Sequence, residues 1–368
     1  MSQDFVVIGA GIIGLATALE LSRRGAKVTV LERGVAGGES SWAGGGILCA
    51  LPPWQYPPAV TRLTLWSEQL YPGWTGDLLA ATGIDPEYHR SGLLMLPDFE
   101  RESARVWCRE HLVECVPVHS GDICAHMSLD AGALWLPQVA QVRNPRLIKA
   151  LQRRLEIAKV KLIEHCEVKA WKISQKRLAS VVTPRGEFSA EGYIVCGGAW
   201  SRHITGNFSL QLDIKPVRGQ MLLLKAQPGF LTCIVMQGGI YLIPRKDWHI
   251  LVGSTVEETG FDNSTTEEAK HELLSRATRL FPPLNEKLLV QQWAGLRPGS
   301  PHNIPTIDRH PQLEDLYINS GHFRYGVTMA PGSARILANL VLGIAEPIDI
   351  SPYRWPVKIP ARQAGYLG

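Results

Sequence analysis

The chain has 368 residues, which is long enough for two domains and a large hydrophobic core. Hydrophobic residues make up 45% of the sequence and charged residues 20%, as is usual for a globular protein. The formal net charge of +4 is small, and no basic block is interleaved with aromatic residues, which argues against a nucleic-acid partner. The longest apolar stretch, residues 336–345, is about half a membrane span, so we expect no transmembrane segment.

Seven cysteines are present, and none lies in a CxxC pair or a Cys/His cluster with zinc spacing. We therefore expect reduced thiols, no bound metal and a cytoplasmic protein. The N-terminus enters an apolar run with no basic region before it, so no signal peptide is visible.

The first 32 residues predict a strand, a helix and a second strand. An apolar run at 5–8 leads into a glycine-rich turn, and apolar residues at helical spacing follow over 13–24. A second β-rich run, 27–31, ends at Glu32. An acid in this position can accept hydrogen bonds from the diol of a ribose, as in dinucleotide-binding folds.

The turn itself reads Gly9-x-Gly11-x-x-Gly14. Gly9 permits the tight turn, Gly11 lets the backbone approach a pyrophosphate, and Gly14 lets the helix pack closely on the strand. Free N–H groups at the start of the helix can bind the phosphates. The alternative interpretation is a glycine turn that serves the fold alone.

Beyond Glu32 the chain leaves this unit. Residues 34–46 are rich in Gly and Ser and predict a loop that can wrap closely around a flat or charged group, and a proline-dense segment follows at 51–58. Two helices are predicted over 59–82 and 99–114, with a strand at 92–96 between them.

The middle of the chain predicts one more helix and then a series of strands. Asn144 is the expected N-cap of a helix that ends near residue 159, with Pro145 in its first position. The β-rich runs that follow lie at 161–164, 167–173, 178–183 and 187–196, and Gly197-Gly198-Ala199-Trp200-Ser201 closes them.

Longer alternating strands, typical of a large mixed or antiparallel sheet, are predicted between residues 214 and 253. A capped amphipathic helix is expected over 264–281, and a last helix from about Gly332 to Leu342. The strands of this part are predicted at 217–225, 233–237, 240–244, 248–253, 291–296 and 316–319.

Together these elements predict an α/β protein with two interleaved domains. A Rossmann-like nucleotide-binding domain is expected to combine residues 1–50, 140–205 and 295–350. An α+β substrate domain, built on the large sheet, is expected to combine residues 51–139 and 206–294. Residues 351–368 would form a C-terminal tail.

Four blocks of sequence resemble the FAD-dependent D-amino-acid oxidase superfamily, and within it the bacterial glycine oxidases linked to thiamine biosynthesis. The resemblance covers nearly the whole chain. The blocks are the N-terminal turn with Glu32, Val195-Cys-Gly-Gly-Ala-Trp-Ser201, Ala294-Gly-Leu-Arg-Pro298, and Gly321-His-Phe-Arg-Tyr-Gly-Val-Thr-Met-Ala-Pro-Gly332.

The resemblance implies FAD as the cofactor and assigns a set of residues to it. Glu32 and Arg33 would lie on the adenosine ribose, and Val168 would meet the adenine through its backbone. A helix that begins near Gly332 would direct its positive end toward the flavin ring. The remaining cofactor residues would be Gly9, Gly11, Ile12, Ile13, Gly14, Ser40, Ser41, Gly45, Gly46, Ile47, Gly198, His322, Phe323, Arg324, Tyr325, Gly326, Val327 and Thr328.

For the substrate, the resemblance assigns Arg297 as the clamp of a carboxylate, with Arg324 beside it and a hydrogen bond from Tyr241. Arginine suits this role because its planar fork makes two parallel hydrogen bonds with a carboxylate. Arg297 could instead form a structural ion pair with an acid such as Asp308, and Tyr241 could be a half-buried strand residue. Met236 and Val256 are candidate pocket walls, for which core packing is the alternative.

The implied reaction is hydride transfer from the Cα of glycine, sarcosine or a small D-amino acid to FAD. Dioxygen would then give hydrogen peroxide, and the imine would hydrolyse to glyoxylate and ammonia. Because no cysteine follows Cys233, we expect FAD to be bound without a covalent link. Relatives imply a homo-oligomer, with a tetramer as one possibility.

Three alternatives stay open from the sequence. The chain could be a sarcosine oxidase or D-amino-acid oxidase of the same fold, a dehydrogenase that uses another electron acceptor, or a flavin-binding module without turnover. Gly44-Gly45-Gly46 is richer in glycine than is common in the family, and Val256 stands where a methionine can occur. Either difference could widen the pocket.

Overall fold

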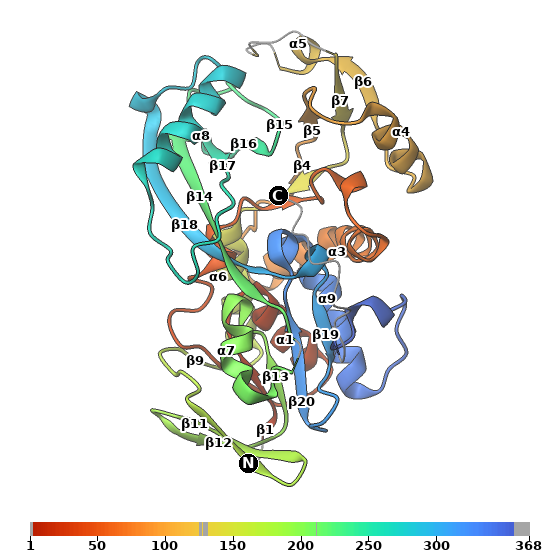
Figure 1. Cartoon of the computed structure of the whole chain (residues 1–368), viewed down its shortest axis with the longest axis vertical. Coiled ribbons are helices and arrows are strands. Elements are labelled where there is room, and N and C mark those ends of the chain that lie inside the picture. Colours follow the sequence, from red (N-terminus) through yellow and green to blue (C-terminus); the bar gives the residue numbers. More distant parts are fainter. Residues whose placement is uncertain (1–2, 125–126, 128–131, 211, 357–368) are drawn as a thin grey trace.

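The computed structural model describes residues 3–124, 127, 132–210 and 212–356. Two large sheets lie toward opposite ends of the long axis, with helices between and around them (Figure 1). The sequence-based expectation of an α/β fold with a large mixed sheet is confirmed.

The six-stranded sheet in the lower half of Figure 1 is built around the N-terminal strand, β1 (Gln3–Ile8). It pairs in parallel with β2 (Val28–Leu31) and β13 (Ala190–Val195). The order is β19-β20-β13-β1-β2-β9, in which only β19 (Thr306–Arg309) is antiparallel to its neighbour; β9 is Lys161–Ile163 and β20 is Leu316–Ser320. The parallel core of this sheet brings the carboxyl ends of its strands to one edge, where such folds bind nucleotides.

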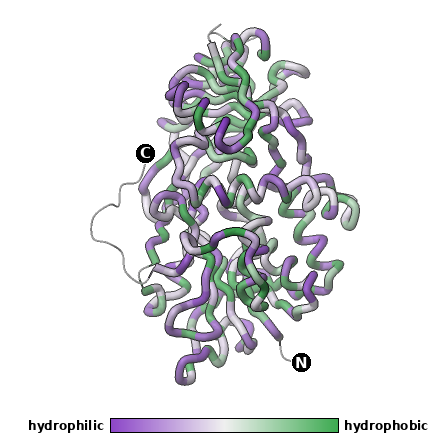
Figure 2. The backbone as a smooth tube through the Cα atoms, turned by 90° about the vertical axis from the view of Figure 1, so that its right-hand side faces the viewer, coloured by the Kyte–Doolittle hydropathy of each residue, from purple (hydrophilic) through white to green (hydrophobic). Residues whose placement is uncertain are grey.

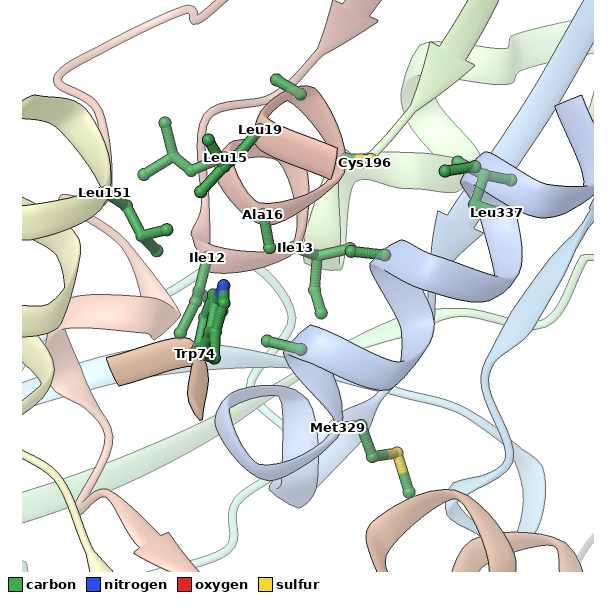
Figure 3. Close-up of a cluster of buried hydrophobic side chains, with 14 of the residues drawn as sticks. Ile12, Ile13, Leu15, Ala16, Leu19, Trp74, Leu151, Cys196, Met329 and Leu337 are labelled. Carbon is green, nitrogen blue, oxygen red and sulfur yellow. The ribbon is translucent and has the colours of Figure 1, made fainter. Parts of the chain in front are cut away.

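Helices bury the apolar surface of this sheet. In Figure 3, Ile12, Leu15 and Leu19 of α1 (Ile12–Arg23) lie in one cluster with Leu151 and Leu337. These two partners come from α6 (Asn144–Ile157) and α9 (Gly326–Leu342), and α3 (Pro58–Thr82) packs on α9 and α6. The cluster fixes α1, and with it the glycine-rich turn, because α1 is buried along most of its length.

The eight-stranded sheet occupies the upper half of Figure 1, with α8 (Glu267–Leu280) against it. The order is β18-β14-β17-β16-β15-β5-β7-β6, and only β5 and β15 pair in parallel. Hydrophobic segments run through both halves of the molecule in Figure 2. The bounds are β5 (Leu93–Met95), β6 (Val116–His119), β7 (Gly132–Leu136), β14 (Lys215–Lys225), β15 (Ile234–Gln237), β16 (Ile240–Pro244), β17 (His249–Gly253) and β18 (Leu289–Gly299).

Two small three-stranded sheets, β10-β11-β12 and β3-β8-β4, complete the fold. Strand β18 pairs with β14 along its whole length, so it continues across the domain boundary expected at residue 295. The remaining elements are β3 (Ile47–Leu48), β4 (His89–Arg90), β8 (Ala140–Gln141), β10 (Ala170–Ser174), β11 (Arg177–Thr183), β12 (Gly186–Phe188), α2 (Ser40–Ala43), α4 (Arg101–Glu110), α5 (Ser120–Ile123) and α7 (Ser201–Thr205).

Several helix starts differ from the sequence-based predictions; α8, for example, begins at Glu267 and not at the expected residue 264. Helix α9 begins at Gly326, six residues before the expected start, and Pro331 lies inside it. Asn144 is the first residue of α6 and not its N-cap, and its side-chain amide donates to the carbonyl of Ser41 (2.9 Å). The early start of α9 has a tertiary cause: the hydroxyl of Tyr71 donates to the carbonyl of Val327, which Pro331 leaves without its helical partner.

The described start of the expected tail packs against the protein. Tyr353 donates to the carbonyl of Ala59 (2.7 Å), and Arg354 pairs with Asp308 (2.9 Å). The rest of the expected tail, residues 357–368, lies outside the described residues. Within the described ranges, no helix combines the length and apolar character needed to span a membrane.

Candidate active site

A cavity of about 1050 Å³ reaches from the nucleotide-binding edge of the six-stranded sheet to the eight-stranded sheet. At one end it is lined by residues at the carboxyl ends of β1 and β2, among them Gly9 and Glu32. At the other end it is lined by Tyr241 of β16 and Arg297 of β18. The two groups of residues that the sequence singles out therefore face the same space.

The turn after β1 has the geometry of a phosphate-binding turn. Gly9 has φ +103°, and a Cβ there would lie 2.5 Å from the carbonyl oxygen of Cys196. Helix α1 begins directly after Gly11, with no side-chain cap and no acidic residue in its first turn. No acidic residue of α1 opposes its positive end, and Gly11, Ile12 and Ile13 place that end at the cavity wall, which suits a pyrophosphate.

Glu32 is buried in the cavity wall, 8% exposed, and its two carboxylate oxygens accept hydrogen bonds from the N–H groups of Ala10 (2.7 Å) and Gly34 (2.9 Å). These bonds fix the carboxylate while each oxygen keeps a further lone pair for a ribose hydroxyl. Arg33 lies next to it, paired with Glu39 (2.5 Å) and stacked over the ring of Trp200, 3.6 Å from its centroid.

The loop expected between residues 34 and 46 contains the short helix α2. The hydroxyl of Ser41 accepts from the N–H of Ile12 (2.9 Å), and the hydroxyl of Ser40 donates to the carbonyl of Leu296. Ser41 can still donate its proton to a phosphate oxygen, because an N–H bond uses only an acceptor site of the hydroxyl. The loop thus joins the phosphate turn to β18.

The C-terminal block, residues 321–332, contributes a tight turn and the start of a helix to the cavity wall. Gly321 has φ +86°, and α9 begins at Gly326 with no acidic residue in its first turn. His322 is buried, its Nε2 lies 2.9 Å from the hydroxyl of Ser333, and burial lowers its pKa to about 3. The imidazole is therefore neutral at any working pH and is a weak base.

All the residues assigned to the cofactor or substrate line the cavity except two. Gly14 lies behind the turn, where a Cβ would stand 1.9 Å from the carbonyl oxygen of Gly9, so it serves the packing of α1 on β1. Thr328 is buried and donates to the carbonyl of Ile47 (3.1 Å). Met236 and Val256, the candidate pocket walls, both line the cavity.

These residues fit an FAD molecule. The phosphate turn would hold the pyrophosphate, Glu32 the ribose, and Gly45 and Gly46 the flavin ring. A Cβ at Gly45 would lie 2.7 Å from Ile243, and at Gly46 2.2 Å from the carbonyl oxygen of Val142, so this part of the wall admits no larger residue without rearrangement. Its bare backbone allows a planar ring to approach closely.

Arg297 is oriented by three acceptors in the protein. Its guanidinium donates to the carbonyls of Arg218 (3.3 Å) and Thr255 (3.0 Å) and to the hydroxyl of Ser254 (2.7 Å). A guanidinium has five N–H groups, so two remain for Tyr241 and for an anion. Room for the group comes from Gly219, where a Cβ would lie 2.0 Å from Nη1 of Arg297.

The charge of Arg297 is not neutralised by a neighbouring acid. In the described part of the chain its guanidinium forms no ion pair, and Asp308, the alternative partner, binds Arg354. Burial lowers the pKa of Arg297 from its usual value; Tyr241 opposes this shift and Arg324 adds to it. Two guanidiniums near each other at a cavity wall form a site for a carboxylate.

Sequence reasoning missed the residues that hold Arg297. Ser254 and Thr255 lie more than 40 positions away in the chain, in a loop with no motif of its own. Gly219 lies within β14 and pairs with Gly295 of β18. The only local sequence signal for this contact is Gly219 itself, because a glycine inside a strand indicates that another group approaches closely.

Comparisons with known proteins identify the family of the chain. The family model described as FAD dependent oxidoreductase matches residues 4–340. The glycine oxidase of Pseudomonas aeruginosa is 44% identical over 359 residues, covering 96% of this chain and 98% of that protein. The bifunctional protein ThiO/ThiG of Trichormus variabilis is 31% identical and covers 93% of this chain, which matches 53% of that longer protein.

Among solved structures, the glycine oxidase of Geobacillus kaustophilus superposes with a TM-score of 0.91 at 27% identity, and the match covers 97% of this chain and 99% of that one. A match of the family model over most of the chain, together with these relatives, establishes that the chain belongs to the FAD dependent oxidoreductase family.

Proposed function

We propose that this chain is an oxidase of glycine and other small amino acids, with Arg297 as the anchor of the substrate carboxylate. The observation that carries the proposal is a guanidinium without an acidic partner among the described residues, held at the wall of the cavity that also contains the dinucleotide turn. The similarity to glycine oxidases over nearly the whole chain supports glycine as the substrate.

In this proposal the protein acts mainly by positioning. Arg297 binds the carboxylate through an N–H group that its protein acceptors leave free, Tyr241 adds a phenolic hydrogen bond, and Arg324 contributes a second positive charge. FAD, when bound, accepts the hydride equivalent from the Cα of the amino acid. Met221 and Met236 line the same space and keep water from the reacting carbon.

No strong base is required at the reacting carbon, provided that the amine arrives neutral. His322 has a pKa of about 3, lowered by burial, and its Nε2 is engaged with Ser333. Solvent therefore removes the proton from the ammonium group of the substrate before the Cα–H bond is broken. The reaction rate should therefore depend on pH through the pKa of the substrate's amine.

We infer further properties from the family resemblance and the sequence. Dioxygen would be the electron acceptor, with hydrogen peroxide, glyoxylate and ammonia as products. FAD would be bound without a covalent link, because no cysteine follows Cys233. We also propose that the protein is cytoplasmic, forms a homo-oligomer and serves thiamine biosynthesis.

A peroxide-coupled assay with glycine, sarcosine, D-alanine and D-proline tests the function. We expect peroxide from glycine and sarcosine in air, and loss of the yellow flavin absorbance when glycine is added without oxygen. Bleaching without peroxide in air would indicate a dehydrogenase. The absence of bleaching by all four amines would contradict the proposal.

A further inference from the structure

A further arginine, Arg245, lies behind the cavity wall and is not part of the reaction described above. Arg245 follows β16 and is 7% exposed. In the described part of the chain its guanidinium forms no ion pair with a carboxylate; it is bound by neutral oxygens. Burial without a carboxylate partner is costly for a guanidinium, so a specific role for the charge is needed to explain it.

The acceptors of Arg245 surround the glycine triplet at residues 44–46. One terminal nitrogen donates to the carbonyl of Val142 (2.9 Å) and to Oε1 of Gln141 (2.9 Å), and the other donates to the carbonyl of Gly45 (2.7 Å). The N–H of Val142 in turn donates to the carbonyl of Gly46 (2.9 Å). Arg245 thereby connects the eight-stranded sheet to the glycine segment of the cavity wall that is assigned to the flavin.

The bond to Gly45 also fixes the direction of the next N–H group. The Gly45–Gly46 peptide is trans, so its C=O and N–H point in opposite directions. The carbonyl points to Arg245, which lies outside the cavity lining, whereas Gly45 and Gly46 line the cavity. Among the described residues, no acceptor binds the N–H of Gly46, which leaves this group available on the cavity side.

We propose that Arg245 is a positioning residue for the cofactor: it orients the Gly45–Gly46 peptide so that the N–H of Gly46 donates to the flavin ring. A donor fixed in this way stabilises the ring more after reduction, when the ring carries more negative charge. The proposal rests on FAD as the cofactor of the family and is independent of which amine is oxidised.

The test compares three variants of the full-length protein: Arg245→Met, Arg245→Lys and, as a control, Arg143→Met. Arg143 is a neighbouring, partly exposed arginine that pairs with Asp247 (2.8 Å). Its replacement removes a positive charge near Arg245 but none of the hydrogen bonds to the glycine segment. The measurements are the Kd of FAD, the Kd of ADP for the apoprotein and the midpoint potential of bound FAD.

For Arg245→Met we expect the Kd of FAD to rise at least tenfold while the Kd of ADP changes less than twofold, because ADP does not reach the glycine segment. Reduced FAD should lose about ten times more affinity than oxidised FAD, which lowers the midpoint potential by about 30 mV for a two-electron couple. Arg245→Lys should show the same changes at smaller size, and Arg143→Met should leave all three values near those of the wild type.

Two results would overturn the proposal. One is an unchanged midpoint potential in Arg245→Met with equal losses of FAD and ADP affinity, which would indicate a purely structural role. The other is a shift in Arg143→Met as large as in Arg245→Met, which would indicate a general effect of charge. If Arg245→Met does not fold, wild-type FAD affinity and midpoint potential in Arg245→Lys, whose single ammonium cannot replace the fork, would contradict the proposal.

Discussion

At the scale of single residues, the arrangement around Arg297 separates orientation from binding. Three backbone or hydroxyl oxygens hold the guanidinium, and none of them carries a negative charge. The positive charge is thus kept available for a ligand, whereas an ion pair with an acid would have consumed it. Arg218 illustrates the contrast, since it is neutralised by Glu257 (2.6 Å) and Asp262 (2.6 Å).

Replacement of Arg297 by alanine should weaken the binding of carboxylate ligands by about 1.5–3 kcal/mol, or about ten- to hundredfold in Kd, because a charge-assisted hydrogen-bonded pair is lost. Titration of the holoenzyme with acetate, followed by the flavin absorbance, measures this directly. Arg297→Lys is the matched control: it keeps the charge without the fork and should recover only part of the affinity. Wild-type affinity in Arg297→Ala would place the anchor elsewhere.

The pH dependence of kcat/KM should follow the substrate and not the protein. The ammonium form predominates at low pH and only the neutral amine reacts, so kcat/KM should rise with pH until the pKa of the amine is passed. His322, with a pKa of about 3, does not titrate in this range, and Arg297 stays protonated throughout. A profile that is flat from pH 6 to pH 10 would contradict this account.

At the scale of elements, α9 shows how a helix can begin earlier than its sequence suggests. Pro331 has no N–H, so the carbonyl of Val327, four residues earlier, loses its usual helical partner. The hydroxyl of Tyr71, from α3, donates to that carbonyl instead. Sequence rules stop a helix near Pro331 because they cannot include a donor that lies 256 positions away.

A double-mutant cycle tests this compensation. Tyr71→Phe should lower the free energy of unfolding by about 1–3 kcal/mol, because it leaves a partly buried carbonyl without a donor. In a Pro331→Ala background the alanine N–H can bind Val327, so the same Tyr71→Phe change should cost much less. Denaturant unfolding of the four proteins gives the coupling energy, and equal costs of Tyr71→Phe in both backgrounds would refute the explanation.

The β1–α1 turn offers a second test at this scale. Gly9→Ala should abolish FAD binding, because its Cβ would lie 2.5 Å from the carbonyl oxygen of Cys196 and its φ is +103°. Gly25→Ala is a matched control: Gly25 also has a positive φ, +90°, but no atom lies within 4 Å of a Cβ there. It should cost stability without changing the Kd of FAD; equal Kd values in the two variants would contradict the assigned role of the turn.

At the scale of the whole molecule, local sequence patterns predict most elements but not how the site closes. The β1–α1–β2 unit follows from apolar periodicity and three glycines, and Arg297 and Tyr241 from the family resemblance. The supports of Arg297, however, depend on contacts over 40 or more positions, such as the bond from Arg297 to Ser254 (2.7 Å). Such contacts leave no local pattern in the sequence.

The cavity also shows that both large sheets are required to form the site. The six-stranded sheet provides the phosphate turn and Glu32, whereas the eight-stranded sheet provides Tyr241 and Arg297. Segment 40–47 contacts both parts through Ser41 and Ser40. Cofactor binding and substrate binding are thus properties of the assembled chain, and neither sheet alone contains the complete site.

The most direct test is a crystal structure of the FAD complex with acetate, a two-carbon carboxylate that has no amine to oxidise. We expect the carboxylate oxygens within hydrogen-bond distance of the Arg297 guanidinium and the Tyr241 hydroxyl, with the methyl carbon in contact with the flavin ring. Acetate bound away from Arg297, or a flavin ring too far from that guanidinium for two carbons to bridge, would contradict the account.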